Sequence, residues 1–459
     1  MESGVKFWAL LGGPALAAAI GMWMFVLNID QEICFVASVA IVCVIWWVFE
    51  PVAIPITSLL PLALLPLLGI LTPTEVAHAY GNPLILLLMG GFILSKSMES
   101  SGAHRRIALS MVNFCGTSSD RSLVLGFMVA AAALSMWISN TATTLMLLPV
   151  ALAIIEKAKG DELAVPLLLG IAYAASVGGM GTPIGTPPNL IFMQVYQENT
   201  GNEISFTTWM SWALPVVIVF IPVIMYWLTR NLSGSSNIEL PEVGEWRTEE
   251  RRVMIVFGLT ALAWITRSEP FGGWSDWLDM QYANDASVAL LAVVALFVIP
   301  NGKGEKLLNW DTAVTIPWGV LLLFAGGICL SKGFAASGLS QLLGDGLAGL
   351  SGLPMLLLMA VICLSVTFMT ETTSNTASTS LLMPVLMAMA LVTGIRPELV
   401  MVPAAMTASC AFMLPVATGP NTVVYSSGRF TTRRMAKEGV FLNFVGVILV
   451  SVICYWTLV

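Results

Sequence analysis

The sequence carries little charge for its length. Only 10% of its 459 residues are Asp, Glu, Lys or Arg, whereas charged residues make up about 25% of an ordinary soluble domain. Hydrophobic residues account for 57% of the chain, and long apolar runs recur along it. A helix needs about 20 such residues to cross the hydrocarbon core of a bilayer. The composition therefore excludes a large soluble domain and predicts an all-α polytopic membrane protein.

Histidine and paired cysteines are also scarce. The two histidines, His78 and His104, are far apart in sequence, and the chain contains neither a His-Glu-x-x-His nor a Gly-x-Ser-x-Gly motif. The seven cysteines occur singly, without a Cys-x-x-Cys pair, and are expected to be small buried residues. These absences argue against an enzyme with a His-based metal site or triad, although an intramembrane enzyme and a channel remain alternatives from other classes.

The apolar runs predict about 11 membrane-spanning helices and two exceptions. Segments 122–156 and 352–395 are too long for one span and are interrupted by Ser-Asn-Thr in the middle, so each is predicted to be a re-entrant hairpin. We expect an N-terminal half at 1–230, a cytoplasmic linker at 231–252 and a C-terminal half at 253–459.

The positions of the basic residues predict the orientation of the chain. Cytoplasmic loops are enriched in Lys and Arg, and most of the 20 Lys and Arg residues fall on one side of the predicted topology, for example Arg105, Arg106, Arg251 and Arg252. The loop at 267–285 on the other side is mainly acidic. This asymmetry predicts a multi-pass membrane protein with a cytoplasmic N-terminus and an external C-terminus.

Two sequence elements occur twice in the same order. Residues 139–149 begin Ser-Asn-Thr-Ala-Thr-Thr, and residues 374–384 begin Ser-Asn-Thr-Ala-Ser-Thr. About 45 residues after each copy comes a second pair, Gly-Thr-Pro-Pro-Asn at 185–189 and Ala-Thr-Gly-Pro-Asn at 417–421. The predicted topology places five crossings, an odd number, between the two Ser-Asn-Thr copies. It therefore predicts an inverted-topology repeat, as in many secondary transporters.

The second pair of elements predicts broken helices at 165–196 and 399–426. Backbone groups freed inside a membrane are tolerated only where they are buried in protein or line a watery cavity. Ser, Asn and Thr at a helix start can cap its N–H groups, and the positive end of the helix dipole favours an anion. Hydroxyl, amide and carbonyl oxygens suit a small alkali cation. Since neither Ser-Asn-Thr segment contains Lys or Arg, a bound dianion would need a co-bound cation such as sodium.

With both pairs of motifs in order, the chain resembles the divalent anion/sodium symporter family, which includes bacterial dicarboxylate and animal citrate transporters. The resemblance covers essentially the whole chain. It implies sodium-coupled uptake of C4-dicarboxylates such as succinate, malate and fumarate by a homodimer in a lipid membrane, the bacterial inner membrane. Each protomer would have a fixed scaffold domain and a transport domain that moves like an elevator. No nucleic acid partner is expected.

The resemblance also implies the binding residues. The first sodium site would use Ser135, Ser139, Asn140 and Gly185, and the second Thr370, Thr373, Asn375 and Ala417. The substrate carboxylates would meet Ser139, Asn140, Thr141, Thr186 and Pro187 from one half and Ser374, Asn375, Thr376 and Thr418 from the other. Gly419 departs from the proline that often follows this threonine in the family.

Several alternatives remain open on the sequence alone. The chain could be a dicarboxylate or tricarboxylate exchanger, or a carrier of another anion such as citrate, sulfate or arsenite. Exchangers of the family often place a basic residue where this chain has Thr143 and Ser378, which favours sodium coupling. Glu371, a rare carboxylate near a predicted midplane, either takes part in function or only braces the hairpin. Gly178, Gly179 and Gly181 are expected to permit close helix packing.

Overall fold

The structure is a computed structural model that describes residues 2–115, 119–157, 161–232, 244–268, 272–347, 349 and 352–459. Regular structure in these residues is helical, with one isolated antiparallel bridge between Pro300 and Lys306. Eight of the described helices are long and apolar enough to span a membrane, and three shorter helices are also apolar. The prediction of an all-α, multi-pass membrane protein is confirmed; the number of crossings, the re-entrant hairpins and the orientation stay predictions.

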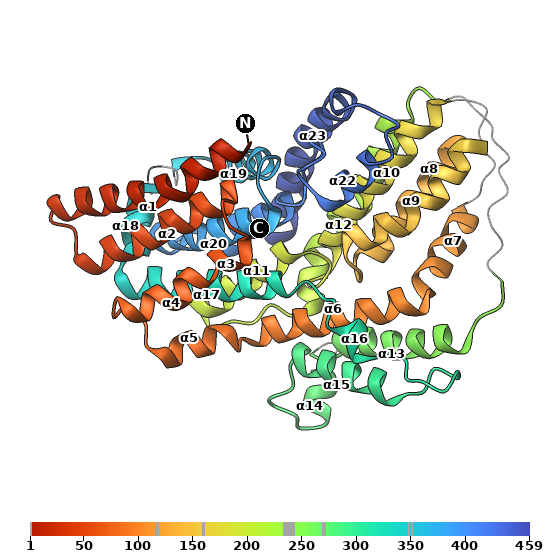
Figure 1. Ribbon diagram of the computed structural model, residues 1–459, viewed down its shortest axis with the longest axis horizontal. Coiled ribbons are helices and arrows are strands. Elements are labelled where there is room, and N and C mark those ends of the chain that lie inside the picture. The colour runs from red at the N-terminus through yellow and green to blue at the C-terminus, as the bar shows by residue number, and fades with distance from the viewer. Residues whose placement is uncertain are drawn as a thin grey trace.

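The first half of the chain forms helices along the whole long axis of the molecule (Figure 1). They are α1 (Glu2–Val26), α2 (Gln31–Phe49), α3 (Ile54–Thr57), α4 (Leu59–Leu67), α5 (Pro73–Tyr80), α6 (Pro83–Ser101), α7 (Ala103–Cys115), α8 (Asp120–Ser135), α9 (Asn140–Lys157), η1 (Asp161–Leu163), α10 (Ala164–Gly178), η2 (Gly179–Gly181), α11 (Pro187–Thr200) and α12 (Phe206–Thr229).

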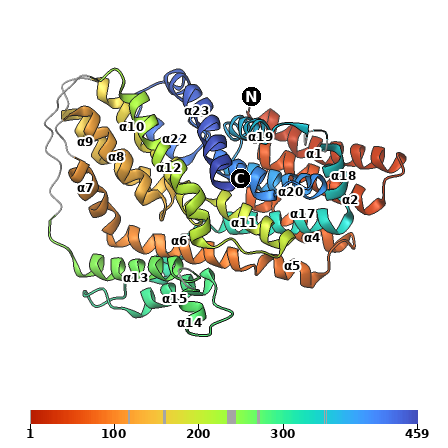
Figure 2. The ribbon, with the colours of Figure 1, turned by 180° about the vertical axis from the view of Figure 1, so that it is seen from behind.

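The second half begins with a group of helices beside α6 (Figure 2). Its helices are α13 (Thr248–Ile265), α14 (Gly273–Trp277), α15 (Asp285–Val298), α16 (Trp310–Ala313), α17 (Trp318–Ser337), α18 (Leu339–Leu347), α19 (Met355–Thr370), α20 (Asn375–Thr393), α21 (Pro397–Thr407), α22 (Gly419–Tyr425) and α23 (Thr432–Leu458). Residues 233–243 of the predicted linker lie outside the described residues, and its last residues already belong to α13.

Helix α10 is the most buried of the long apolar segments. In the span Ala164–Gly181, 94% of the window lies inside the protein. Its small residues allow this, because a Cβ on Gly178 would overlap the backbone of Ala132 in α8. By contrast, only 17% of the corresponding window of α1 is buried. Within the single chain, α1 therefore leaves most of its apolar surface uncovered, whereas α10 belongs to the core.

Both Ser-Asn-Thr copies lie where one helix ends and another begins. Helices α8 and α9 meet there in the first half, and α19 and α20 in the second. Both predicted broken helices are interrupted as well, since α10 and α11 are separated by η2 and a short turn, and α21 and α22 by the irregular segment 408–418. The proline-rich elements explain the restarts: Pro187 and Pro420 stand in the first turns of α11 and α22, where a missing N–H costs no helical hydrogen bond.

Candidate functional site

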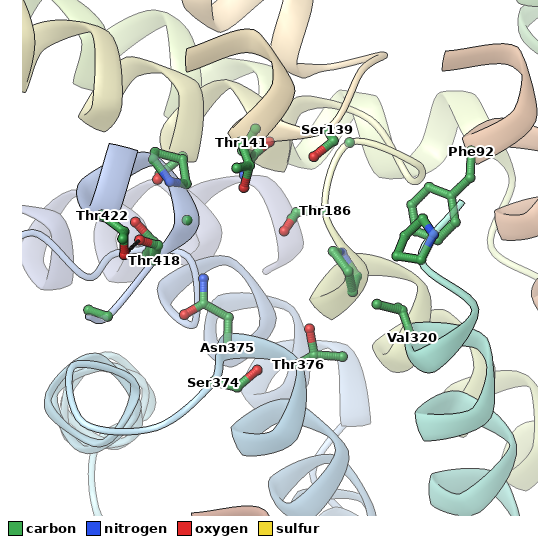
Figure 3. Close-up of a pocket in the computed structure, with 18 of the residues that line it drawn as sticks. Phe92, Ser139, Thr141, Thr186, Val320, Ser374, Asn375, Thr376, Thr418 and Thr422 are labelled. Carbon is green, nitrogen blue, oxygen red and sulfur yellow. Dashed lines mark hydrogen bonds between the residues drawn. The ribbon is translucent and has the colours of Figure 1, made fainter. Parts of the chain in front are cut away.

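The four interrupted segments surround one cavity of about 630 Å³. Figure 3 shows Ser139 and Thr141 at one side, Ser374, Asn375 and Thr376 at another, and Thr186 between them. The two halves of the chain thus meet in a single cavity. Helices α6 and α17 complete its wall with apolar side chains that include Phe92 and Val320.

The structure brings most of the expected binding residues to this cavity. Those that line it are Ser139, Asn140, Thr141, Gly185, Thr186, Pro187, Thr373, Ser374, Asn375, Thr376, Ala417 and Thr418. The two exceptions, Ser135 and Thr370, are fully buried behind it. They contact it indirectly, through the two asparagines.

In the first half, oxygen atoms converge around Gly179 and Gly185. The Ser135 hydroxyl donates to the Asn140 amide oxygen Oδ1 over 2.5 Å. A Cβ on Gly179 would lie 2.7 Å from that Oδ1 and 3.1 Å from the Gly185 carbonyl oxygen. A Cβ on Gly185 would lie 3.0 Å from the Met136 carbonyl oxygen and even closer to the Gly179 carbonyl oxygen. These oxygens leave no room for a side chain, and their neutral, hard character fits a sodium ion.

Gly179 was expected only to permit helix packing, and that interpretation was incomplete. The packing role holds for Gly178 against Ala132 and for Gly181, where a Cβ would meet the Met136 side chain. Gly179 instead lies against the Asn140 amide. The sequence signal was its place at the end of an apolar run, six positions before the Gly-Thr-Pro-Pro-Asn element that begins at Gly185.

The second half repeats this arrangement with a different hydroxyl. Thr370 Oγ1 donates to Asn375 Oδ1 over 2.6 Å and also lies 3.0 Å from the Ala408 carbonyl oxygen. Thr373, the other expected hydroxyl ligand, bonds to the Met369 carbonyl oxygen at 2.9 Å and to the Ser378 hydroxyl at 2.5 Å. Its hydroxyl is therefore engaged within the turn between α19 and α20, although the residue lines the cavity.

Two further asparagines hold the broken helices in shape. Asn189 Nδ2 donates to the carbonyl oxygens of Gly179 and Thr182, at 3.1 and 2.7 Å. Asn421 Nδ2 donates in the same way to Ala411 and Leu414, at 2.9 and 3.0 Å. The Pro-Asn pairs were expected only to break the helices. Their occurrence in both elements was the available signal that the asparagine also has a role.

Three helices of eight or more residues, α9, α11 and α20, begin at the cavity. We expected Ser, Asn and Thr side chains to cap such helices, but neither Thr186 at the start of α11 nor Ser374 at the start of α20 makes a side-chain capping hydrogen bond. The first N–H groups of α11 and α20 are therefore left without that partner, whereas at the start of the shorter α22 the Thr418 hydroxyl accepts from the Asn421 N–H at 3.2 Å, as expected. Together with the positive end of the helix dipole, they can receive an anion such as a carboxylate.

The described residues that line the cavity include no basic side chain with which to hold an anion. Among the described residues that line it, the one with a charged side chain is Glu50, at the C-terminal end of α2. A dianion in this cavity would therefore meet hydroxyls, amides and backbone N–H groups, and its charge would need a mobile cation as partner.

The position of Gly419 is explained by contact between the halves. A Cβ there would lie 3.1 Å from Thr141 Cβ and 3.2 Å from its Cγ2, and closer still to the Thr141 hydroxyl. Proline, which also has a Cβ, would meet the same atoms. Glycine thus allows the start of α22 to approach the start of α9 directly.

Gly419→Ala is expected to raise the KM for the transported anion about tenfold, because Thr141 must move within the binding cavity; a forced overlap of this kind costs about 1–3 kcal/mol. Uptake kinetics on the full-length protein measure this. The double variant Gly419→Ala/Thr141→Ser, which removes Cγ2, should recover part of the loss. An unchanged KM in Gly419→Ala would contradict the contact.

The whole chain is similar to known transporters. Residues 6–459 match the family model described as the sodium:sulfate symporter transmembrane region. The sodium-dependent dicarboxylate transporter SdcS of Staphylococcus saprophyticus is 38% identical over 97% of this chain and 91% of its own length. The protein of that name from Staphylococcus aureus is 37% identical over 98% of this chain and 90% of its own length.

Solved structures resemble the fold. The YdaH transporter of Alcanivorax borkumensis has a TM-score of 0.61 at 16% identity, over 85% of this chain and 88% of that one. MtrF of Neisseria gonorrhoeae has a TM-score of 0.59 at 15% identity, over 83% of each chain. At this low identity the likeness concerns the fold alone.

Proposed function

Because this chain belongs to the divalent anion/sodium symporter family, and so is a transporter rather than an enzyme, we propose that it couples sodium influx to the uptake of C4-dicarboxylates. The observation that carries the proposal is the cavity itself. It combines free helix N-termini and hydroxyls, which suit carboxylates, with two oxygen clusters that suit sodium, and its described lining has no basic residue.

In this proposal the first sodium ion binds at Ser135, Ser139, Asn140 and Gly185, to which we add the neighbouring Gly179 carbonyl. The second binds at Thr370, Thr373, Asn375 and Ala417. The carboxylates of succinate, malate or fumarate meet the two Ser-Asn-Thr segments together with Thr186, Pro187 and Thr418. Each bound cation offsets part of the substrate charge, so that anion and sodium bind more tightly together than alone.

The repeated hydrogen bonds support an inverted repeat in which both halves contribute to one transport domain. That domain would move relative to a scaffold in a homodimer of the bacterial inner membrane, with the N-terminus in the cytoplasm. Helices α6 and α17, whose Phe92 and Val320 face the cavity, would belong to the surface along which it moves. Apolar side chains suit such a sliding surface because they form no directional bonds that would have to break.

The test is uptake of labelled succinate by the full-length protein in sealed vesicles. Moving one charge across 100 mV is worth about 2.3 kcal/mol, so carrying a dianion inward against that potential costs about 4.6 kcal/mol. The two sodium ions at the proposed sites offset this charge, and any further sodium ion moved with them makes the net charge positive. We therefore expect concentrative uptake that requires an inward sodium gradient, and acceleration by a negative interior would show that more than two sodium ions move with each dianion.

Other results would identify a different carrier. Sodium-independent uptake that requires internal dicarboxylate would make the protein an exchanger. Sodium-dependent uptake of citrate or sulfate, in the absence of succinate uptake, would overturn the proposed substrate and support the proposed sodium coupling. Non-saturating flux without coupling would indicate a channel and contradict the proposal.

A further inference from the structure

Glu371 is a buried carboxylate in the apolar part of the chain, with 3% of its surface exposed. It directly follows Thr370 at the end of α19. Its Oε1 accepts hydrogen bonds from the backbone N–H groups of Phe412 (2.7 Å) and Met413 (2.9 Å) and from Asn443 Nδ2 (2.7 Å). Its Oε2 accepts from the Leu414 N–H at 3.0 Å. All four bonds are accepted, which is the pattern of an ionised carboxylate.

Such a group is expensive to bury. The ion pairs among the described residues do not include Glu371, so its charge is compensated by amide dipoles alone. Burying an ionised carboxylate without such partners is strongly unfavourable, and ionisable residues at membrane depth are rare. An aliphatic side chain would avoid the cost. The location of the three N–H groups that Glu371 binds therefore indicates the role of its charge.

Those N–H groups belong to the irregular segment 408–418 between α21 and α22, which carries Ala417 and Thr418 to the cavity. Because a trans peptide points its C=O opposite to its N–H, the carbonyls of Ala411 and Phe412 face away from Glu371. They accept from Asn421 Nδ2 at 2.9 Å and from the Tyr173 hydroxyl at 2.6 Å. The segment is thus held from both sides.

In the first half, the corresponding segment between α10 and α11 is held without a buried charge. Ser135 and Thr370 stand 235 positions apart, as do Asn140 and Asn375, and the same spacing relates Met136 to Glu371. The Met136 side chain lies against Gly181, and the Met136 carbonyl accepts from the Thr182 hydroxyl. The position that corresponds to Thr182 in the second half is Leu414, which has no hydroxyl. In the second half, the hydrogen bond from the Leu414 N–H to the Glu371 carboxylate takes the place of the bond that the Thr182 hydroxyl makes in the first half.

We propose that Glu371 is a positioning residue for the cation site of the second half. The inference rests on the proposed function, because it takes Thr370, Asn375 and Ala417 to be a sodium site. Glu371 fixes the peptides 412–414, and Thr370 binds the Ala408 carbonyl at the start of the same segment. Without the carboxylate, the N–H groups of Met413 and Leu414 lose their acceptor and that of Phe412 keeps only the longer bond to Asn443 Oδ1, at 3.3 Å. The carbonyl of Ala417 is then no longer held toward the site. Sodium then binds more weakly, while the anion-binding groups remain.

The experiment compares Glu371→Gln with wild type in vesicles at graded sodium concentrations. Glutamine keeps the size but turns one acceptor into an N–H₂ donor that faces N–H groups. The sodium concentration for half-maximal uptake should rise at least about tenfold, as expected for losing a hydrogen-bonded charge. Maximal uptake at saturating sodium should stay within about threefold of wild type.

Glu438→Gln is the matched control. Glu438 is 1% exposed, but it pairs with Arg230 at 2.9 Å and with Arg434 at 3.0 Å rather than with the segment 408–418. Its neutralisation should lower thermal stability and leave the sodium dependence unchanged. Tyr173→Phe is a second variant, which loosens the same segment without changing any charge. It should raise the sodium concentration for half-maximal uptake about threefold. If Glu371→Gln does not fold, this variant tests whether the segment positions the cation site.

Backbone hydrogen exchange of residues 412–414 supplies a measurement that does not depend on transport. These amides should exchange faster in Glu371→Gln and at the wild-type rate in Glu438→Gln. Sodium-dependent wild-type uptake with unchanged half-maximal sodium in Glu371→Gln and Tyr173→Phe would overturn this assignment alone. Sodium-independent uptake by the wild type would overturn the proposed function, and with it the site that Glu371 is said to position.

Discussion

Asn140→Ala and Asn375→Ala are each expected to reduce sodium-driven uptake about tenfold to a hundredfold. Each change removes the amide oxygen that accepts the hydroxyl hydrogen bond of Ser135 or Thr370 and that we propose as a sodium ligand. An interaction with a charged partner is worth about 1.5–3 kcal/mol, which corresponds to the stated range. Initial rates of labelled succinate uptake at a fixed sodium gradient measure the effect.

Asn199→Ala serves as the control for both variants. Asn199 lies near the end of α11, where its Nδ2 donates to the Val195 carbonyl oxygen at 2.7 Å, and it does not line the cavity. This variant should transport at nearly the wild-type rate. Wild-type uptake by either Asn140→Ala or Asn375→Ala would show that the corresponding asparagine is not a binding residue.

Gly185→Ala is expected to abolish transport nearly completely. Its Cβ would overlap the Gly179 carbonyl oxygen and lie 3.0 Å from that of Met136. Both are backbone atoms in buried surroundings, so they cannot turn aside as a flexible side chain could. The methyl group would also occupy the space between oxygens that we assign to sodium. Relief of the overlap requires a backbone shift, whose cost is about 1–3 kcal/mol or more.

The corresponding position in the second half provides the control. Ala417 lies 232 positions after Gly185 and corresponds to it in the second half. It already carries a Cβ at the cavity. Ala417→Gly should therefore transport within about threefold of wild type and lose only about 0.4–1 kcal/mol of stability through added chain freedom. Equal activity of Gly185→Ala and Ala417→Gly would contradict the difference that we infer between the two halves.

Much of the site was predictable because its signals are local in sequence. Ser135 and Asn140, and likewise Thr370 and Asn375, are five residues apart, and each pair meets across one helix junction. Proline and glycine at the restarts of α11 and α22 act through the backbone of their own turn. Apolar length alone identified the chain as a multi-pass membrane protein, since a bilayer requires about 20 such residues whatever their neighbours are.

Contacts between distant segments could not be predicted in this way. Glu371 reaches N–H groups 41 to 43 positions further along the chain, and Tyr173 reaches the Phe412 carbonyl across 239 positions. The sequence left open whether Glu371 is functional or only a brace, because it does not say which backbone groups a side chain will meet.

By itself, the sequence determined that the chain is helical, lies in a membrane and carries two copies of a polar, helix-breaking element. These properties follow from composition and from the conformational limits of single residues, which hold in any fold. Only the tertiary structure decided that the two copies line one cavity and that Gly419 lies against Thr141. It also decided that a buried carboxylate binds the irregular segment 408–418 in the second half, where the first half has a methionine at the corresponding position. Each of these depends on how helices pack, and packing sums many small contacts between residues that are far apart in the chain.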